Sequence, residues 1–171
     1  MTLAEFNTLP SARAESLLMD CCGCARWAAR VAEQHPFANM AALREAADTI
    51  WRSLGRADWL EAFSHHPQIG EKAASGSASA RQWAEGEQSG TRAAVEDVKT
   101  RQAAGNRAYF EKFGYIYIVC ATGKSAEEML AILEQRLQND PATELRVAAE
   151  QQWLITQIRL DKLLAGEQRS R

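Results

Sequence analysis

The stretch that decides the fold is Asn39-Met40-Ala41-Ala42-Leu43-Arg44-Glu45-Ala46-Ala47-Asp48-Thr49-Ile50-Trp51-Arg52-Ser53-Leu54-Gly55. Asn39 is a favourable N-cap residue, and Gly55 supplies a stop signal at the other end. Between them the apolar residues recur at the spacing of a helix that buries one face. These residues are Met40, Leu43, Ala47, Ile50, Trp51 and Leu54. We therefore expect one complete amphipathic helix between the two end signals.

The same periodicity predicts helices over most of the chain. Towards the N-terminus, one helix is expected to start at Pro10-Ser11 and another to run past Trp27 and end near His35-Pro36. Towards the C-terminus, Ser125 to Glu128 is a capping box, and Asp140-Pro141 opens a long last helix. The residues of that helix expected to face inward are Leu145, Ala148, Ala149, Ile155, Ile158 and Leu163.

Two segments interrupt the helical pattern. Residues 70–90 contain several glycines and serines and are expected to form a loop with a short helix. Residues 113–121 are aromatic and β-branched, as in a strand, but no second convincing strand is present to pair with them. The amides and carbonyls of this segment must find other partners if buried, and a polar, planar ligand could be one of them. We predict one all-α domain over residues 1–171, a helical bundle with one extended, unpaired segment near 115–121.

Composition limits the class of protein. With 171 residues, 46% of them hydrophobic, the chain can bury the core of one globular domain. A net charge of -2 without any basic cluster argues against nucleic acid as a partner. No apolar stretch is long enough to span a membrane, and neither a signal peptide nor a peroxisomal address is present, so we expect a cytoplasmic protein.

Three of the four cysteines gather in Cys21-Cys22-Gly23-Cys24. A C-x-x-C pair can bind a metal or carry out redox chemistry. A zinc site needs about four ligands, however, and the fourth cysteine, Cys120, is distant in the sequence. The flanking residues are helical in pattern, unlike those of a thioredoxin-type motif. We therefore expect small buried residues at a tight junction between two helices.

His66 is the strongest candidate for proton chemistry. The amphipathic segment Asp58 to Phe63 leads directly into His65-His66, after which Pro67 forbids further helix and Gly70 permits a turn. A titratable ring held rigidly at a helix end suits acid–base work near neutral pH. The alternative is that His66 only caps the helix.

Other polar residues could join His66 or stand apart from it. His65, His66 and Glu71 could suggest a metal, but their spacing matches no known zinc pattern, so no metal site is expected. Glu87 and Gln88 could form a solvated turn, or an acid–base partner and an amide that hold a ligand. Arg159 lies among apolar neighbours on the last helix, where it could reach the surface or meet an anion in a pocket.

Six motifs follow one another along the chain. They are Cys21 to Trp27, Trp59-Leu60-Glu61-Ala62-Phe63, His66-Pro67-Gln68-Ile69-Gly70, Glu87-Gln88, Lys112-Phe113-Gly114-Tyr115, and Arg159-Leu160. In this order they resemble the OHCU decarboxylase family, whose members act in urate breakdown. The resemblance implies an all-helical protein, usually a homodimer, that needs no cofactor. It also implies conversion of 2-oxo-4-hydroxy-4-carboxy-5-ureidoimidazoline to (S)-allantoin and carbon dioxide, with a functional link to the preceding hydrolase of the pathway.

The resemblance also assigns roles by position. His66 matches the catalytic histidine, Glu87 the pocket glutamate that acts beside it, and Arg159 the arginine that binds an anion. One departure is Ala84, because the family often has a serine at that position. The remaining positions that the resemblance implies contact the substrate are Pro67, Ala84, Glu85, Gly86, Gln88, Ile118, Val119, Cys120, Ala121 and Thr122.

Chemistry is compatible with these roles. A carboxylate leaves as carbon dioxide when an electron sink accepts the pair it leaves behind, and a ring C=N beside it is such a sink. Two other classes stay open. One is a metal-dependent hydrolase that uses His65, His66, Glu71 and Glu87, and the other is a helical interaction module without enzymatic activity.

Overall fold

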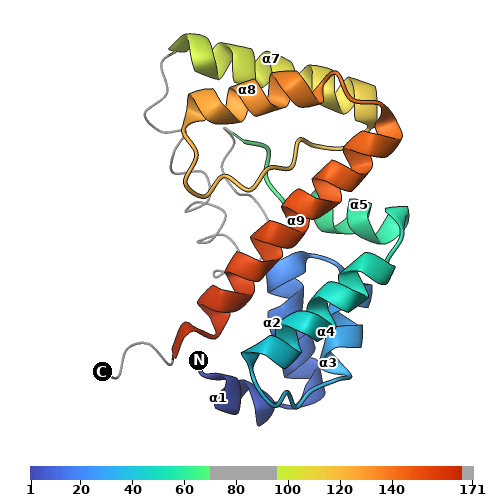
Figure 1. The fold of residues 1–171 in the computed structure, drawn as a ribbon, viewed down its shortest axis with the longest axis vertical. Helices are drawn as coiled ribbons and strands as arrows, with labels where there is room; N and C mark the ends of the chain where they lie inside the picture. Colours follow the sequence, from blue (N-terminus) through green and yellow to red (C-terminus); the bar gives the residue numbers. More distant parts are fainter. Residues whose placement is uncertain (70–95, 167–171) are drawn as a thin grey trace. The chain divides into compact units, whose positions relative to one another are not determined.

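The computed structural model describes residues 1–69 and 96–166. These residues form eight helices and no strand, which confirms the all-α prediction for the part of the chain described (Figure 1). The helices are α1 (Leu3–Asn7), α2 (Ser11–Cys22), α3 (Ala25–Ala32), α4 (Met40–Ser53), α5 (Arg56–Ser64), α7 (Glu96–Phe113), α8 (Ala126–Arg136) and α9 (Pro141–Leu163). The chain divides into two compact units, residues 1–62 with 153–171, and residues 63–152.

The first unit contains α1 to α4, most of α5 and the C-terminal part of α9. Helix α3 packs against both α2 and α4. The indole of Trp27, which is fully buried, donates a hydrogen bond of 3.0 Å to the carbonyl of Ala47. The core that these helices enclose also includes Phe6, Leu18, Val31, Leu43 and Leu160.

Helix α4 forms where the opening stretch of sequence predicts it. The side chain of Asn39 accepts a hydrogen bond of 2.9 Å from the amide of Ala42, as an N-cap does. The other end differs from the prediction, because the helix stops at Ser53 and Leu54 is already extended. Gly55 is not left-handed; its amide donates to Asp58 at 3.2 Å. Gly55 therefore helps to begin α5 and is not the stop signal of α4.

The cysteine cluster lies at the junction of α2 and α3. Cys21 and Cys22 end α2, Gly23 turns the chain in the left-handed conformation (φ 76°), and Cys24 precedes α3. All three cysteines are buried and carry free thiols. This confirms the prediction of small buried residues between two helices.

The second unit contains α7, α8 and the N-terminal part of α9. Helices α7 and α8 pack together and run in the same direction (Figure 1). Val98 near the start of α7 clusters with Ala126 and Leu130 of α8, while Lys112 near its end donates to the carbonyl of Leu137. Parallel neighbours require a connection that returns along their length, and residues 114–125 make that return.

The returning connection contains the extended segment predicted from the sequence. Residues 116–121 have no regular secondary structure, and no strand pairs with them within the described chain. Gly114, left-handed at φ 79°, ends α7, and Ser125 with Glu128 forms the predicted capping box of α8. Between these points the segment is buried from Tyr117 to Ala121.

Candidate functional site

His66 lies just beyond the end of α5, as the sequence predicts. Its backbone amide donates to the carbonyl of Phe63 at 3.1 Å, and Pro67 follows. The ring is half-buried, whereas the neighbouring His65 is exposed. The Nε2 atom of His66 lies 2.7 Å from the side-chain oxygen of Gln152 on α9. His66 therefore does more than cap its own helix, because its ring is bound to a residue 86 positions away.

Gln152, which contacts His66, is a further candidate residue that the sequence alone did not suggest. Its side chain is fully buried in the middle of α9. It belongs to a set of polar residues on the inward stripe of that helix, namely Glu144, Gln152, Thr156 and Arg159. Buried polar groups are almost always hydrogen-bonded to a partner. The sequence signal that could have pointed to Gln152 is therefore the recurrence of polar residues at helical spacing on a helix face that also carries buried alanines.

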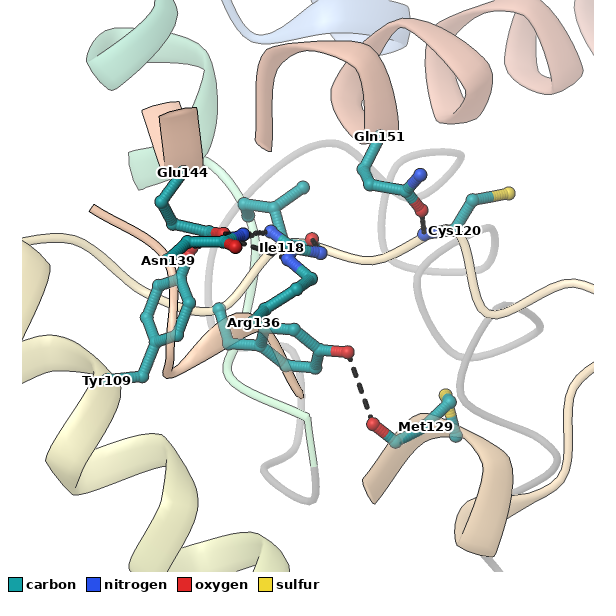
Figure 2. Close-up of polar contacts among 9 residues, drawn as sticks. Tyr109, Ile118, Cys120, Met129, Arg136, Asn139, Glu144 and Gln151 are labelled. Carbon is teal, nitrogen blue, oxygen red and sulfur yellow. Dashed lines mark hydrogen bonds and ion pairs between the residues drawn. The ribbon is translucent and has the colours of Figure 1, made fainter. Parts of the chain in front are cut away.

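Side chains of neighbouring helices take up the backbone groups of the extended segment (Figure 2). The guanidinium of Arg136 donates to the carbonyl of Ile118 at 2.7 Å, and the amide of Cys120 donates to the side chain of Gln151 at 2.9 Å. Lys124 donates to the carbonyl of Cys120 at 2.8 Å. Within the described residues, the amides of Val119 and Ala121 donate to no protein acceptor. The segment is thus fixed at alternate residues.

Arg136 is itself held in a buried network (Figure 2). Its guanidinium donates to Glu144 at 2.5 and 2.8 Å, and Glu144 also accepts from Tyr109 and, at 2.7 Å, from Asn139. Burial alone would lower the pKa of Arg136, but the hydrogen bond with Glu144 and the charge around it leave that pKa raised. Burial and the bond to Glu144 raise the pKa of Tyr109. The network therefore holds the charged guanidinium of Arg136 in place for its hydrogen bond to the carbonyl of Ile118.

The candidate residues are distributed as follows. His66, Pro67 and residues 118–122 lie in the second unit, where α9 binds both His66 and Cys120 through adjacent glutamines. Arg159 lies in the first unit and is only 5% exposed, so it does not reach the surface. Its Nη1 atom lies 3.5 Å from the carbonyl of Cys21. The positions outside the described residues are Glu71, Ala84, Glu85, Gly86, Glu87 and Gln88.

One group of metal-capable side chains is present in the described part of the chain, and it includes neither His65 nor His66. It consists of Cys24, Asp58 and Glu61. Each member has another role: Asp58 pairs with Arg26 at 3.4 Å, and Glu61 accepts from the amide of Ala25 at 3.3 Å. Burial raises the pKa of Cys24 to about 11, so its thiol keeps its proton at neutral pH.

Comparison with known proteins shows the family of this chain. The family model of OHCU decarboxylase matches residues 7–161, which is nearly the whole chain. This chain belongs to the OHCU decarboxylase family. It is also similar to a crystal structure of an OHCU decarboxylase in the presence of (S)-allantoin, with a TM-score of 0.76 and 34% identity. That match covers 88% of this chain and 98% of the other.

Two relatives extend the comparison. The chain is 35% identical over 149 residues to the uric acid degradation bifunctional protein TTL of Arabidopsis thaliana. The match covers 86% of this chain but 46% of that protein, so the chain spans less than half of its length. It is 31% identical to the 2-oxo-4-hydroxy-4-carboxy-5-ureidoimidazoline decarboxylase of Amia calva, over 80% of this chain and 79% of the relative. Among the described helices, none combines the length and apolar character needed to cross a bilayer.

Proposed function

We propose that this protein decarboxylates 2-oxo-4-hydroxy-4-carboxy-5-ureidoimidazoline to (S)-allantoin and carbon dioxide in urate degradation. Membership of the OHCU decarboxylase family supports the reaction class. The observation that carries the proposal is the position of His66. Its ring lies at the end of a helix, and its Nε2 atom is held 2.7 Å from the side-chain oxygen of Gln152. An anchored imidazole is suited to deliver or remove a proton at one face of a substrate.

The substrate supplies its own electron sink, so the main task of the enzyme is to transfer protons to and from defined atoms of the substrate. The bond from the ring carbon to the carboxylate breaks, and its electron pair forms a double bond to the neighbouring ring carbon. The C=N pair of that carbon moves to nitrogen, which takes a proton. Loss of the hydroxyl proton and protonation of the neighbouring carbon then give allantoin. The enzyme has to hold the carboxylate, move these protons and protonate a single face.

The proposed roles follow this sequence. His66 transfers protons, while Glu87 and Gln88 hold the N–H and C=O edges of the substrate. Arg159 meets the carboxylate, because a guanidinium fork suits that group. Pro67, residues 84–86 and residues 118–122 line the remaining surface. The amides of Val119 and Ala121, which have no protein acceptor within the described chain, support this role for the extended segment.

Other parts of the proposal concern cofactors and partners. We propose that no metal or organic cofactor takes part, because the ring C=N accepts the electron pair. We also propose a cytoplasmic homodimer. The bifunctional uric acid degradation proteins of Arabidopsis thaliana and of Bacillus support a functional link to other enzymes of the pathway, including the preceding hydrolase. Sedimentation analysis tests the dimer directly, and a monomer at micromolar concentration contradicts it.

The deciding experiment supplies the unstable substrate freshly from urate and follows the product by circular dichroism. We expect rapid appearance of (S)-allantoin, in excess over the uncatalysed racemic product. Incubation with a chelator is expected to leave this rate unchanged. Racemic allantoin formed at the uncatalysed rate would overturn the proposed reaction. Loss of activity with loss of bound metal would instead favour a metal-dependent enzyme.

A further inference from the structure

The contact between His66 and Gln152 determines which ring nitrogen carries the hydrogen. The side-chain oxygen of Gln152 lies 2.7 Å from Nε2 of His66. An amide oxygen only accepts hydrogen bonds, so the nitrogen opposite it must be the donor. In a neutral imidazole the other nitrogen, Nδ1, then carries the lone pair.

The surroundings keep this contact in one orientation. Gln152 is fully buried on α9, so its amide needs hydrogen-bond partners within the protein and cannot turn toward solvent. His66 is constrained on its own side by its backbone bond to Phe63 and by Pro67. The preceding residue on α9, Gln151, binds the amide of Cys120 at 2.9 Å. Two adjacent residues of one helix thus hold both the ring and the extended segment.

We propose that Gln152 is a positioning residue that keeps neutral His66 in the Nε2–H tautomer, so that Nδ1 is the atom exchanging protons with the substrate. This inference rests on the proposed function and deepens it. Residues that fix a tautomer act through the group they hold, and the wrong tautomer places the proton on the wrong side of the ring. Glutamine does this without a charge, so it leaves the ring free to cycle between its neutral and protonated forms.

Nitrogen-15 NMR of the histidine-labelled protein reads the tautomer directly. The chain has three histidines, and the His66→Gln variant identifies the signals of His66 by their loss. In the neutral form we expect Nε2 to show the shift of a protonated ring nitrogen and Nδ1 that of an unprotonated one. The reverse pattern would overturn the inference. The spectrum does not depend on turnover: an inactive wild-type protein with the expected pattern would overturn the proposed reaction, while the hydrogen-bonding role of Gln152 would stand.

Variants separate positioning from structural support. Gln152→Leu removes the hydrogen-bond acceptor and keeps a side chain of similar bulk. We expect His66 to become a mixture of the two neutral tautomers. We also expect kcat to fall by about 10–100-fold, as for other residues that orient active groups, while KM changes little. Gln152→Glu keeps an accepting oxygen and should retain the Nε2–H form and more activity. Gln157→Leu, the same change further along α9, is the control and should alter neither. If Gln152→Leu does not fold, the wild-type and Gln152→Glu spectra still decide. Unchanged tautomer and kcat in Gln152→Leu would contradict the proposal.

Discussion

At the scale of single residues, the two adjacent histidines give a matched pair of variants. His66→Gln should lower kcat by about 10²–10⁴-fold, because general acid–base groups typically contribute this much. His65 is exposed, so His65→Gln should retain nearly full activity. Both variants should unfold at similar urea concentrations. A His66→Gln enzyme with nearly normal turnover would remove His66 from the catalytic role.

Arg159 allows a test of geometry at constant charge. Arg159→Lys keeps the positive charge but loses the planar fork that binds a carboxylate with two parallel hydrogen bonds. We expect at least tenfold weaker binding of substrate, seen as a higher KM, since one good hydrogen bond to a charged group contributes about 1.5–3 kcal/mol. Thermal unfolding measures the structural part, because Arg159 is buried near the carbonyl of Cys21. A large loss of stability with unchanged KM would make Arg159 purely structural.

The buried ion pair of Arg136 on α8 with Glu144 on α9 can be compared with an exposed pair that also involves α8. Glu144→Gln leaves Arg136 charged and buried without its counter-ion, which should cost about 3–5 kcal/mol in the free energy of unfolding. Glu134 pairs with Arg101 at 2.7 Å with both side chains about half exposed, and Glu134→Gln should cost less than about 1 kcal/mol. Urea unfolding measures both. Equal losses would contradict the proposed importance of the buried network.

At the scale of helices, Gly105 permits the close approach of α7 and α8. A Cβ atom at this position would lie 2.6 Å from Cδ2 of Leu133, which is fully buried. Gly105→Ala should therefore destabilise the protein by about 1–3 kcal/mol, even though alanine favours helix. Gly55→Ala is the control, because a Cβ atom there meets nothing within 4 Å. A stabilised Gly105→Ala variant, measured by urea unfolding, would show that the two helices can separate without cost.

Helix starts were predictable because their signals are local. The caps at Asn39, Ser125 and Asp140 each bond the backbone two or three residues ahead, so the sequence contains both partners. Gly55 misled the prediction because a glycine after a helix favours, but does not require, the left-handed conformation. The parallel course of α7 and α8 has no local signal, since it depends on pairings across the extended connection.

The candidate site was predictable only in part for the same reason. His66 stands out because Pro67 follows it directly, and Glu87, Gln88 and Arg159 were candidates from their sequence context; the family resemblance gave them roles and supplied the remaining positions. Gln152 did not stand out by itself, because a single glutamine on a helix reads the same whether it is buried or exposed; only its helical spacing with the other polar residues of α9 was a signal. Its partner is 86 residues away, and only the folded chain brings the two together. The predicted contributions of residues 84–88 fall outside the described residues and stay predictions.

At the scale of the whole molecule, buried thiols make the free energy of unfolding depend on pH in the alkaline range. Burial raises the pKa of Cys21 from 9.0 to about 12, although the charge of Arg159 opposes this. Below pH 9 the thiol is protonated in both states, so it has no effect. Between pH 9 and 12 only the unfolded chain loses the proton, so stability falls by about 1.4 kcal/mol per pH unit for this group.

Urea unfolding at about pH 8 and about pH 10 tests this effect. Four tryptophans, Trp27, Trp51, Trp59 and Trp153, lie in the same unit as Cys21 and report its unfolding by fluorescence. Cys21→Ala removes the titrating group, so its loss of stability between the two pH values should be smaller than that of the wild type by about 1.4 kcal/mol. The same loss in both proteins would mean that the thiol titrates normally when folded.

The unpaired extended segment also has a consequence for misfolding. Tyr115-Ile116-Tyr117-Ile118-Val119-Cys120-Ala121 is uncharged, rich in β-branched and aromatic residues, and free of proline, which is the composition of segments that stack into cross-β aggregates. In the native protein Arg136 and Gln151 bond its backbone at Ile118 and Cys120 and keep it from pairing with another chain. We therefore expect these two side chains to protect the segment against aggregation, and removing Arg136 should make refolding fail through precipitation that grows steeply with protein concentration.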